Sequence, residues 1–144
     1  MVKNRTLVLN QAALNIMRKH AVKAYPEECC GFLWGTQIGN RYVVKYALAV
    51  PNRTRLNKRL FFKISYQDYM AAERFAEKSK LVLFGIFHSH PDHPAYPSME
   101  DCRFALPNFA YIIISVKHSK VADMKCWQLN EQTCLFKESL TFIA

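Results

Sequence analysis

The sequence lacks several features that would place it outside the ordinary globular proteins. No stretch approaches the ~18–20 uninterrupted apolar residues with which a helix crosses a bilayer, so a membrane span is excluded. Internal repeats and low-complexity segments are also absent. A composition that is 51% hydrophobic and 22% charged excludes a disordered chain, which needs few apolar residues and a high charge density. The 144 residues have the usual length of one domain, and we predict a single domain over residues 1–144.

Cysteine patterns typical of metal ribbons and redox sites are missing as well. The sequence has no C-x-x-C pair, which excludes a zinc ribbon and a thioredoxin-like site. Its N-terminal segment lacks the apolar run and small-residue cleavage site of a secretory signal. We therefore expect a cytoplasmic protein whose thiols are free and mostly buried, at Cys29, Cys30, Cys102, Cys126 and Cys134.

Acidic side chains are absent between Glu28 and Asp68, although the whole chain has 11 of them against 20 lysines and arginines. The net charge of +9 is therefore concentrated in the first half, which includes Arg41, Lys45, Arg53, Arg55, Lys58, Arg59 and Lys63. Two interpretations are open, a solvated basic face or a surface that binds an anion or an acidic partner. Nucleic acid is the weaker candidate partner, because an RNP-like aromatic motif and a helix-turn-helix pattern are both missing.

Three helices are expected from spacing and capping residues. Apolar residues at helical spacing follow Asn10, a plausible N-cap, and predict a helix over residues 11–24. A serine at position 65 with an acidic residue three positions later predicts the start of a second helix. A short third helix is expected from Ser98 to about Ala105.

Short apolar segments between these helices predict strands. We expect a rigid, proline-rich loop over residues 91–97. The strands are expected at residues 6–9, 31–35, 42–50, 60–62, 81–87 and 110–116, with a hairpin formed by 126–129 and 134–136. Strands interleaved with helices predict an α/β layered domain with a mixed sheet.

The stretch from His88 to Asp101 concentrates residue types that bind metals. His88 and His90 stand two residues apart after a buried apolar run, so in extended backbone both imidazoles point to the same face. Both can therefore reach one ion, and imidazole suits zinc. Asp101 supplies a third ligand if the proline-rich loop folds back over the strand end. Two histidines and one carboxylate leave a fourth position for water, which is the layout of a catalytic zinc site.

Structural interpretations exist for the same residues. A His-x-His pair is often only a polar exit from a sheet, and Ser98-x-x-Asp101 also fits a helix capping box. Two other zinc motifs are absent, the H-E-x-x-H of helix-borne metalloproteases and the H-x-E with P-C-x-x-C of nucleobase deaminases. Asp92 and His93 are further candidates, but the sequence does not fix the geometry of their loop.

The pattern H-S-H-x7-S-x2-D over residues 88–101 resembles the signature of the JAMM metallopeptidases, also called the MPN+ or Mov34/PAD-1-like family. The family has an upstream glutamate three residues before a glycine that opens a strand, and Glu28 stands in that position before Gly31. Asn52 also falls where short prokaryotic members have an asparagine. The resemblance covers residues from about 6 to 129, nearly the whole chain.

This resemblance implies a three-layer α-β-α domain with a mixed, curved central sheet, the JAMM/MPN fold, which is similar to that of cytidine deaminases. It implies that His88, His90 and Asp101 bind one zinc ion per chain. It also implies that Glu28 is the general base and that Ser98 hydrogen-bonds to the water or to the oxyanion. The implied reaction is hydrolysis of a peptide or isopeptide bond, often after the C-terminal Gly-Gly tail of a small ubiquitin-like or sulfur-carrier protein.

The same residues also allow other interpretations of the site and of the function. Adjacent side chains of an extended segment face opposite ways, so only one of Glu27 and Glu28 can face the metal, and the spacing to the following glycine favours Glu28. Cys29 or Cys30 with a histidine would make a Cys–His peptidase, which needs a base oriented by a third group, but His88 and His90 are better explained as metal ligands. The chain could also be a non-catalytic binding module, with the acid-free stretch 29–67 on nucleic acid or an acidic protein, or a silent scaffold. Whether the basic segment 41–63 docks the substrate is left open by the sequence.

Overall fold

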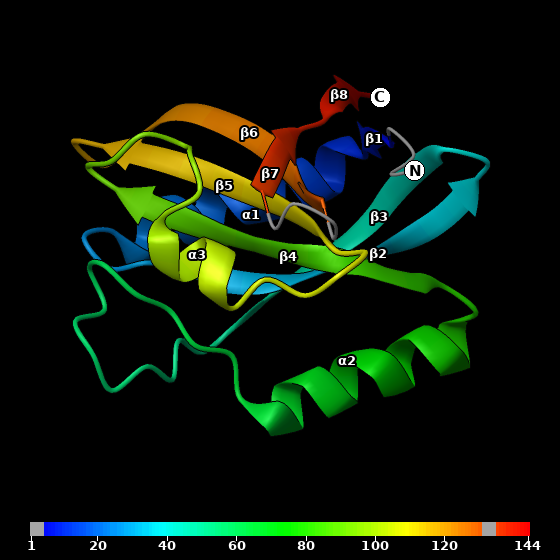
Figure 1. The fold of residues 1–144 in the computed structure, drawn as a ribbon, viewed down its shortest axis with the longest axis horizontal. Coiled ribbons are helices and arrows are strands. Elements are labelled where there is room, and N and C mark those ends of the chain that lie inside the picture. Colours follow the sequence, from blue (N-terminus) through cyan, green and yellow to red (C-terminus); the bar gives the residue numbers. More distant parts are fainter. Residues whose placement is uncertain (1–4, 131–134) are drawn as a thin grey trace.

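The computed structural model describes residues 5–130 and 135–144, which form one sheet with helices on both faces (Figure 1). The predicted first strand and first helix are confirmed, each with its predicted bounds. In chain order the elements are β1 (Thr6–Leu9), α1 (Gln11–Ala24), β2 (Cys30–Ile38), β3 (Arg41–Val50), α2 (Tyr66–Ser79), β4 (Val82–Pro91), α3 (Met99–Arg103), β5 (Ala110–Lys117), β6 (Lys120–Asn130), β7 (Leu135–Glu138) and β8 (Leu140–Ile143).

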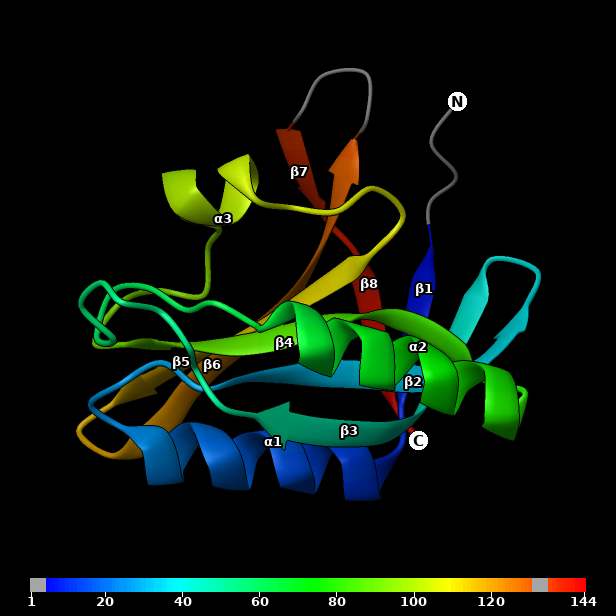
Figure 2. The ribbon, with the colours of Figure 1, turned by 90° about the horizontal axis from the view of Figure 1, so that it is seen from below.

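The sheet is mixed and strongly curved. Its strand order is β7-β6-β5-β4-β2-β3-β1-β8. β1 runs parallel to β3 and β8, and β4 runs parallel to β5, whereas the other neighbours are antiparallel. β7 and β8 stand at opposite ends of this order, yet only Ser139 separates them in the chain. The two ends of the sheet therefore lie close together, and β8 also contacts β6 (Figure 2).

Each face of the sheet carries its own apolar core. Successive side chains of a strand point to opposite faces, so Ile112 and Ile114 of β5 pack on one side and Ile113 packs on the other. The first core includes Leu14 from α1, and the second includes Ala72 from α2. Figure 2 shows α1 on one face of the sheet, with α2 and α3 on the other. The predicted three-layer α-β-α architecture is confirmed.

The predicted helix starts are explained by side chains that cap the first turn. Asn10 accepts a hydrogen bond from the Ala12 N–H at 2.7 Å, and Ser65 accepts one from the Asp68 N–H at 3.1 Å. These bonds satisfy backbone donors that have no partner within the helix. α3 begins after Ser98 in the same way, but it is shorter than predicted and ends at Arg103.

β4 is longer than the sequence predicted. The apolar run ends at Phe87, but the strand continues to Pro91, with His88 opposite Ile113 and His90 opposite Ser115 of β5. The two histidines therefore lie inside a strand and not beyond its end. Hydrophobicity alone placed the boundary too early, because polar side chains on this part of β4 are buried within the protein and not exposed to water.

Other strand predictions need correction. Residues 60–62 are not a strand, because the Asn57 carbonyl accepts hydrogen bonds from the N–H groups of Leu60 and Phe61 and turns the chain there. β6 begins at Lys120, well before the predicted hairpin strand, and β8 was not predicted at all. Much of the early part of β6 is exposed, so its sequence is polar and lacks an apolar signal. Cys134, in the predicted return strand, lies outside the described residues.

Helices of the described part of the chain are all too short or too polar to cross a membrane. This agrees with the absence of a long apolar run in the sequence. The single domain over residues 1–144 and the cytoplasmic location stay predictions.

The described thiols are free, as expected. Cys29, Cys30 and Cys126 are buried, and burial raises the pKa of Cys29 to about 11 and of the other two to about 12. Such thiols carry almost no thiolate at neutral pH, which argues against the Cys–His peptidase alternative. Cys102 on α3 is exposed instead.

Alkylation of the native protein should therefore be selective. We expect iodoacetamide to modify Cys102 at least about tenfold faster than Cys29, Cys30 or Cys126, because the reagent needs access and thiolate. Peptide mass spectrometry over a time course measures the rate at each position. Equal rates would show that the buried cysteines open readily to solvent.

Candidate functional site

β4 places two buried histidines side by side. The rings of His88 and His90 have centroids 5.0 Å apart, His88 is fully buried and His90 is nearly so. β4 lies between β2 and β5 in the sheet, so neighbouring strands hold its backbone on both sides. The prediction that both imidazoles occupy one face of a strand is confirmed.

Glu28 enters the same space from the segment just before β2. Its Oε1 lies 3.5 Å from His88 Nδ1 and 4.0 Å from His90 Nε2, and the side chain is buried. Glu27 is exposed, as expected for a surface carboxylate. Of the two adjacent glutamates, only Glu28 therefore faces the histidines.

Asp101 closes the group from α3. Its Oδ2 lies 3.0 Å from His90 Nε2, and its Oδ1 lies 3.7 Å from His88 Nε2. Burial by itself raises the pKa of Asp101, but the charge of His88 and hydrogen bonds from His90 and the Ser98 N–H hold that pKa well below its usual range. The carboxyl is therefore ionised at neutral pH, the form that binds a cation.

Buried atoms without partners test whether a metal fits here. Among the described residues, both ring nitrogens of His88 and Oε2 of Glu28 are buried without a hydrogen-bond partner. An unpaired buried polar atom is costly, and a bound cation would satisfy one ring nitrogen of His88 and draw the carboxylate oxygens toward it. Ligand atoms of Glu28, His88 and His90 lie within 4.8 Å of one another. Imidazole and carboxylate ligands around one point fit zinc, so the residues present suit this metal.

A hydrogen bond to the loop determines which ring nitrogen of His90 faces the site. Nδ1 lies 2.8 Å from the Pro94 carbonyl oxygen, which can only accept, so Nδ1 carries a hydrogen. Nε2, 3.0 Å from Asp101 Oδ2, is therefore the nitrogen that faces the site and would bind a metal in place of a proton. Two further carbonyls of this loop accept hydrogen bonds, His93 from Ser115 Oγ at 2.6 Å and Ala95 from Trp127 Nε1 at 2.9 Å. The loop between the histidines and α3 is therefore held in place before any ligand binds.

Asp92 and His93, which the sequence left open, lie outside the group. The Tyr25 hydroxyl donates to the Asp92 carboxylate, 2.8 and 2.9 Å from its two oxygens, and ties the loop to the segment that leads to Glu28. The His93 side chain is exposed. Asp92 therefore holds the loop in place, and nothing in its contacts makes it a metal ligand.

Ser98 has the capping role that the sequence also allowed. Its Oγ accepts from the Asp101 N–H at 3.0 Å, and its own N–H donates to Asp101 Oδ2 at 2.9 Å, which completes a capping box. The same Oδ2 faces His90, so this box orients the carboxylate toward the histidines. The serine is exposed, and a direct part in catalysis stays a prediction.

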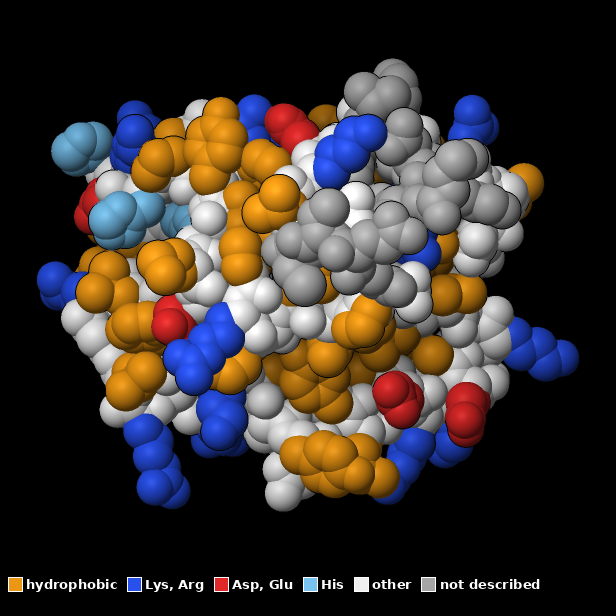
Figure 3. Space-filling model, viewed as in Figure 1, with side chains coloured by type: hydrophobic (Ala, Val, Ile, Leu, Met, Phe, Trp, Pro, Cys, Tyr) orange, Lys and Arg blue, Asp and Glu red, His pale blue; other side chains and the backbone are white. Residues whose placement is uncertain are grey.

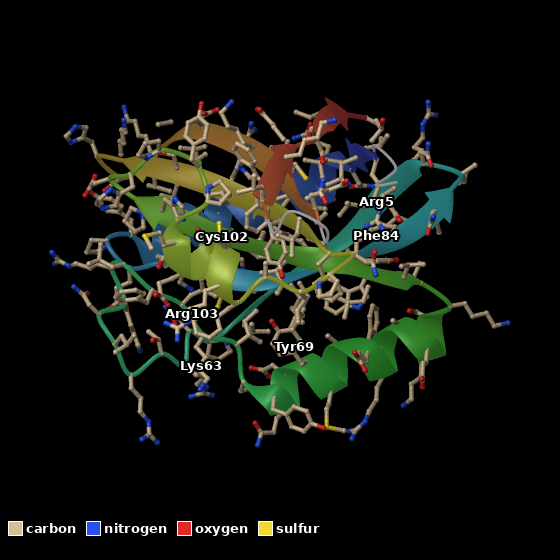
Figure 4. All side chains as sticks on the ribbon, in the orientation of Figure 1. Arg5, Lys63, Tyr69, Phe84, Cys102 and Arg103 are labelled. Atoms are coloured by element: carbon tan, nitrogen blue, oxygen red, sulfur yellow. The ribbon has the colours of Figure 1, made fainter. Side chains whose placement is uncertain are left out.

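A cavity of about 530 Å³ opens beside His88 and Asp101. The loop over residues 51–64 lines one side of it and Phe104, just after α3, lines another. Figure 4 labels Lys63 on this loop and Tyr69 near the start of α2, and both side chains line the cavity.

The walls of this cavity combine apolar and basic side chains. Leu56, Leu60 and Phe104 are each more than half exposed at its rim. The space-filling view shows hydrophobic side chains interspersed with lysines and arginines on this face (Figure 3). Three cations belong to the lining: Arg53, Arg55 and Lys63.

Aromatic residues around the histidines were missed by the sequence reasoning. Phe62 stacks on His88, with ring centroids 4.5 Å apart and planes 25° apart, but the sequence suggested a strand there. Phe104 was placed inside a helix, whereas it follows the helix and faces the cavity. One sequence feature could have indicated this packing. Two adjacent phenylalanines stand in an otherwise polar, basic loop, and a fully exposed loop would not need them.

Comparisons with known proteins agree with one another. The family model described as "Prokaryotic homologs of the JAB domain" matches residues 10–130. A desampylase of Pyrococcus furiosus is 32% identical over 127 residues, which cover 88% of this chain and 84% of that protein. A CysO-cysteine peptidase of Mycobacterium tuberculosis is 25% identical over 124 residues, which cover 85% of this chain and 82% of the relative.

Solved structures show the same fold. The solution structure of a protein from Desulfitobacterium hafniense is 28% identical, has a TM-score of 0.84 and is matched over 96% of this chain and 92% of its own. A JAB1/MPN domain protein from Archaeoglobus fulgidus has a TM-score of 0.58 at 16% identity, over 96% of both chains, which bears on the fold alone.

Proposed function

This chain belongs to the prokaryotic JAB-domain family of hydrolases, and we propose that it uses one zinc ion to hydrolyse an amide bond. The proposed bond follows the C-terminal Gly-Gly tail of a small ubiquitin-like or sulfur-carrier protein. Relatives named desampylase and CysO-cysteine peptidase support this substrate class. The observation that carries the chemistry is the buried meeting of Glu28, His88, His90 and Asp101.

In this proposal His88, His90 and Asp101 hold the zinc ion. Zinc, when bound, lowers the pKa of water from about 15.7 toward 7 and so supplies a nucleophile at neutral pH. Glu28 accepts the proton of the attacking water, because its Oε2 has no other partner among the described residues and its Oε1 faces both histidines. Glu28 then passes the proton to the amine that leaves, which makes it a general base and then a general acid.

Ser98 completes the proposed site. Its Oγ accepts a hydrogen bond from the Asp101 N–H, and this leaves the hydroxyl hydrogen free to be donated. The proposal assigns that hydrogen to the oxyanion that forms on the substrate carbonyl. A donor aimed at developing charge is worth more in a site that excludes water.

A cleavage assay tests the proposed function. The zinc-loaded protein is incubated with fusions in which a Gly-Gly carrier tail is joined to a short peptide through a peptide or isopeptide bond. Mass spectrometry of the products locates the cut, and metal analysis counts zinc per chain. Cleavage after the second glycine with about one zinc per chain supports the proposal. Intact fusions with fully loaded protein would contradict it.

The basic rim of the cavity is the proposed docking surface for the carrier. Arg53, Arg55 and Lys63 line the cavity, and an acidic carrier would be drawn to these charges at low salt. Changing all three to Gln should therefore lower kcat/KM on a carrier-protein fusion by about tenfold, with little change on a short peptide. The loss should shrink as salt is raised.

A control variant removes three positive charges from a surface away from the cavity. Arg18, Lys19 and Lys23 are exposed on α1, on the opposite face of the sheet, and their change to Gln should leave both substrates unaffected. Equal losses in the two triple variants, or equal losses on protein and peptide, would mean that the charge serves solubility and not docking.

A further inference from the structure

Asn52 uses every hydrogen-bonding position of its side chain. Its Nδ2 donates to the Glu28 carbonyl at 3.3 Å and to the Phe61 carbonyl at 3.0 Å. Its Oδ1 accepts from the N–H groups of Thr54 and Lys63, each at 3.1 Å. An asparagine amide has two donor hydrogens and one acceptor oxygen with two lone pairs, so this side chain is fully satisfied.

These four bonds divide into two groups with different effects. The oxygen accepts hydrogen bonds only from within the loop over residues 51–64. The nitrogen donates one hydrogen bond within that loop, to Phe61, and one to the peptide group of Glu28. The three loop partners, Thr54, Phe61 and Lys63, all line the cavity beside His88. One side chain therefore connects the wall of the cavity with the backbone of the proposed base.

The position of the Glu28 carboxylate depends on this backbone. In the described part of the chain its Oε2 has no hydrogen-bond partner, and its Oε1 has only the histidine nitrogens at 3.5 Å or more. The backbone, by contrast, is anchored on both sides: the Glu28 N–H donates to the Lys58 carbonyl at 2.8 Å, and the next N–H donates to Ser89 Oγ at 2.8 Å. The position of the Glu28 carboxylate is therefore set by the position of the Glu28 backbone.

We propose that Asn52 is a positioning residue, which sets the place of Glu28 and joins it to the cavity wall that receives the substrate. The inference rests on the proposed function, because it takes Glu28 as the proton acceptor. A misplacement of about 1 Å at a reacting group can cost on the order of 10²-fold in rate. Asn52 acts through Glu28 and does not touch the reacting atoms itself.

Asn52→Asp separates the two groups of bonds. The variant keeps an acceptor oxygen for Thr54 and Lys63, but it places a second oxygen, in place of the donor, against the carbonyls of Glu28 and Phe61. We expect kcat on a carrier fusion to fall about 10- to 100-fold, with KM and zinc affinity changed by less than about threefold. Loss of folding alone would also lower the apparent kcat at unchanged KM, so kcat is calculated per folded, zinc-loaded protein, with the zinc content measured on the same sample.

Asn57→Asp is the matched control. Asn57 lies in the same loop, and its Oδ1 accepts from the Arg59 N–H at 3.0 Å, a bond that an aspartate keeps. The variant adds the same charge to the same loop without touching Glu28, so its kcat should stay within about twofold of the wild type. Wild-type kcat in Asn52→Asp, or equal losses in both variants, would overturn the inference.

A measurement without substrate separates this inference from the proposed function. If the wild type cleaves no carrier fusion, the proposed function fails, and amide exchange then decides the role of Asn52. The Glu28 N–H, bonded to the Lys58 carbonyl, should exchange at least about tenfold faster in Asn52→Asp than in Asn57→Asp by NMR. Equal exchange would show that Asn52 does not hold the Glu28 backbone.

Discussion

Glu28→Gln is expected to lower the rate of carrier-tail hydrolysis by about 10²- to 10⁴-fold while the variant still folds and binds zinc. Glutamine has the size of glutamate and can occupy the same buried position, but its amide cannot accept the proton of water. The loss should appear in kcat, because proton transfer belongs to the transition state. Product formation by mass spectrometry and zinc content after dialysis measure both quantities on the same sample.

The neighbouring glutamate provides the control. Glu27→Gln makes the same chemical change one residue earlier, on an exposed side chain, and should leave the rate within about twofold of the wild type. If zinc-loaded Glu28→Gln hydrolysed the fusion at the wild-type rate, Glu28 would not be the base. If both variants lost activity equally, the segment and not the carboxylate would be responsible.

Removal of zinc should abolish hydrolysis, and His88→Leu should do the same permanently. Zinc binding should stabilise the folded wild type by about 2.7 kcal/mol when free zinc is 100 times Kd. His88→Leu should not be stabilised by zinc. Without zinc, however, its free energy of unfolding should be no lower than that of the wild type. The reason is that His88 is fully buried with two unpartnered nitrogens, and each such atom costs about 1–3 kcal/mol. Denaturant unfolding with chelator and with zinc gives the four free energies.

His93→Ala is the comparison for this experiment. His93 lies three residues beyond His90 but its side chain is exposed, so the variant should keep the gain in stability with zinc and the activity. A His88→Leu protein that zinc still stabilises as much as the wild type would exclude His88 as a ligand.

The structural features that the sequence predicted correctly depend on short stretches of neighbouring residues. His88 and His90 needed only the two-residue period of an extended chain, and the first two helices needed only a capping side chain and apolar spacing. Neighbours on an extended segment face opposite ways, so only one of Glu27 and Glu28 could face the site. The spacing to Gly31 that the resemblance supplies favoured Glu28, and burial separates the two as expected. Patterns that depend on a few consecutive residues are therefore readable without the fold.

Features that escaped prediction depend on contacts between distant segments. The bonds of Asn52 to Glu28 and of Tyr25 to Asp92 join residues 24 and 67 positions apart, and no local pattern records them. β8 pairs with β1 from the other end of the chain, and its four residues carry too little signal to identify a strand. The cavity beside His88 likewise arises only when the loop and α3 face each other.

The three carbonyls of the loop after β4 have a consequence for how the enzyme matures. They accept hydrogen bonds from His90 of β4, Ser115 of β5 and Trp127 of β6, three neighbouring strands. A shift of one residue in any of these strands would turn its side chain to the other face of the sheet and release the loop. The group of Glu28, His88, His90 and Asp101 is thus brought together only on a correctly paired sheet. A chain whose strands pair out of register should therefore lack an assembled site, however much secondary structure it has.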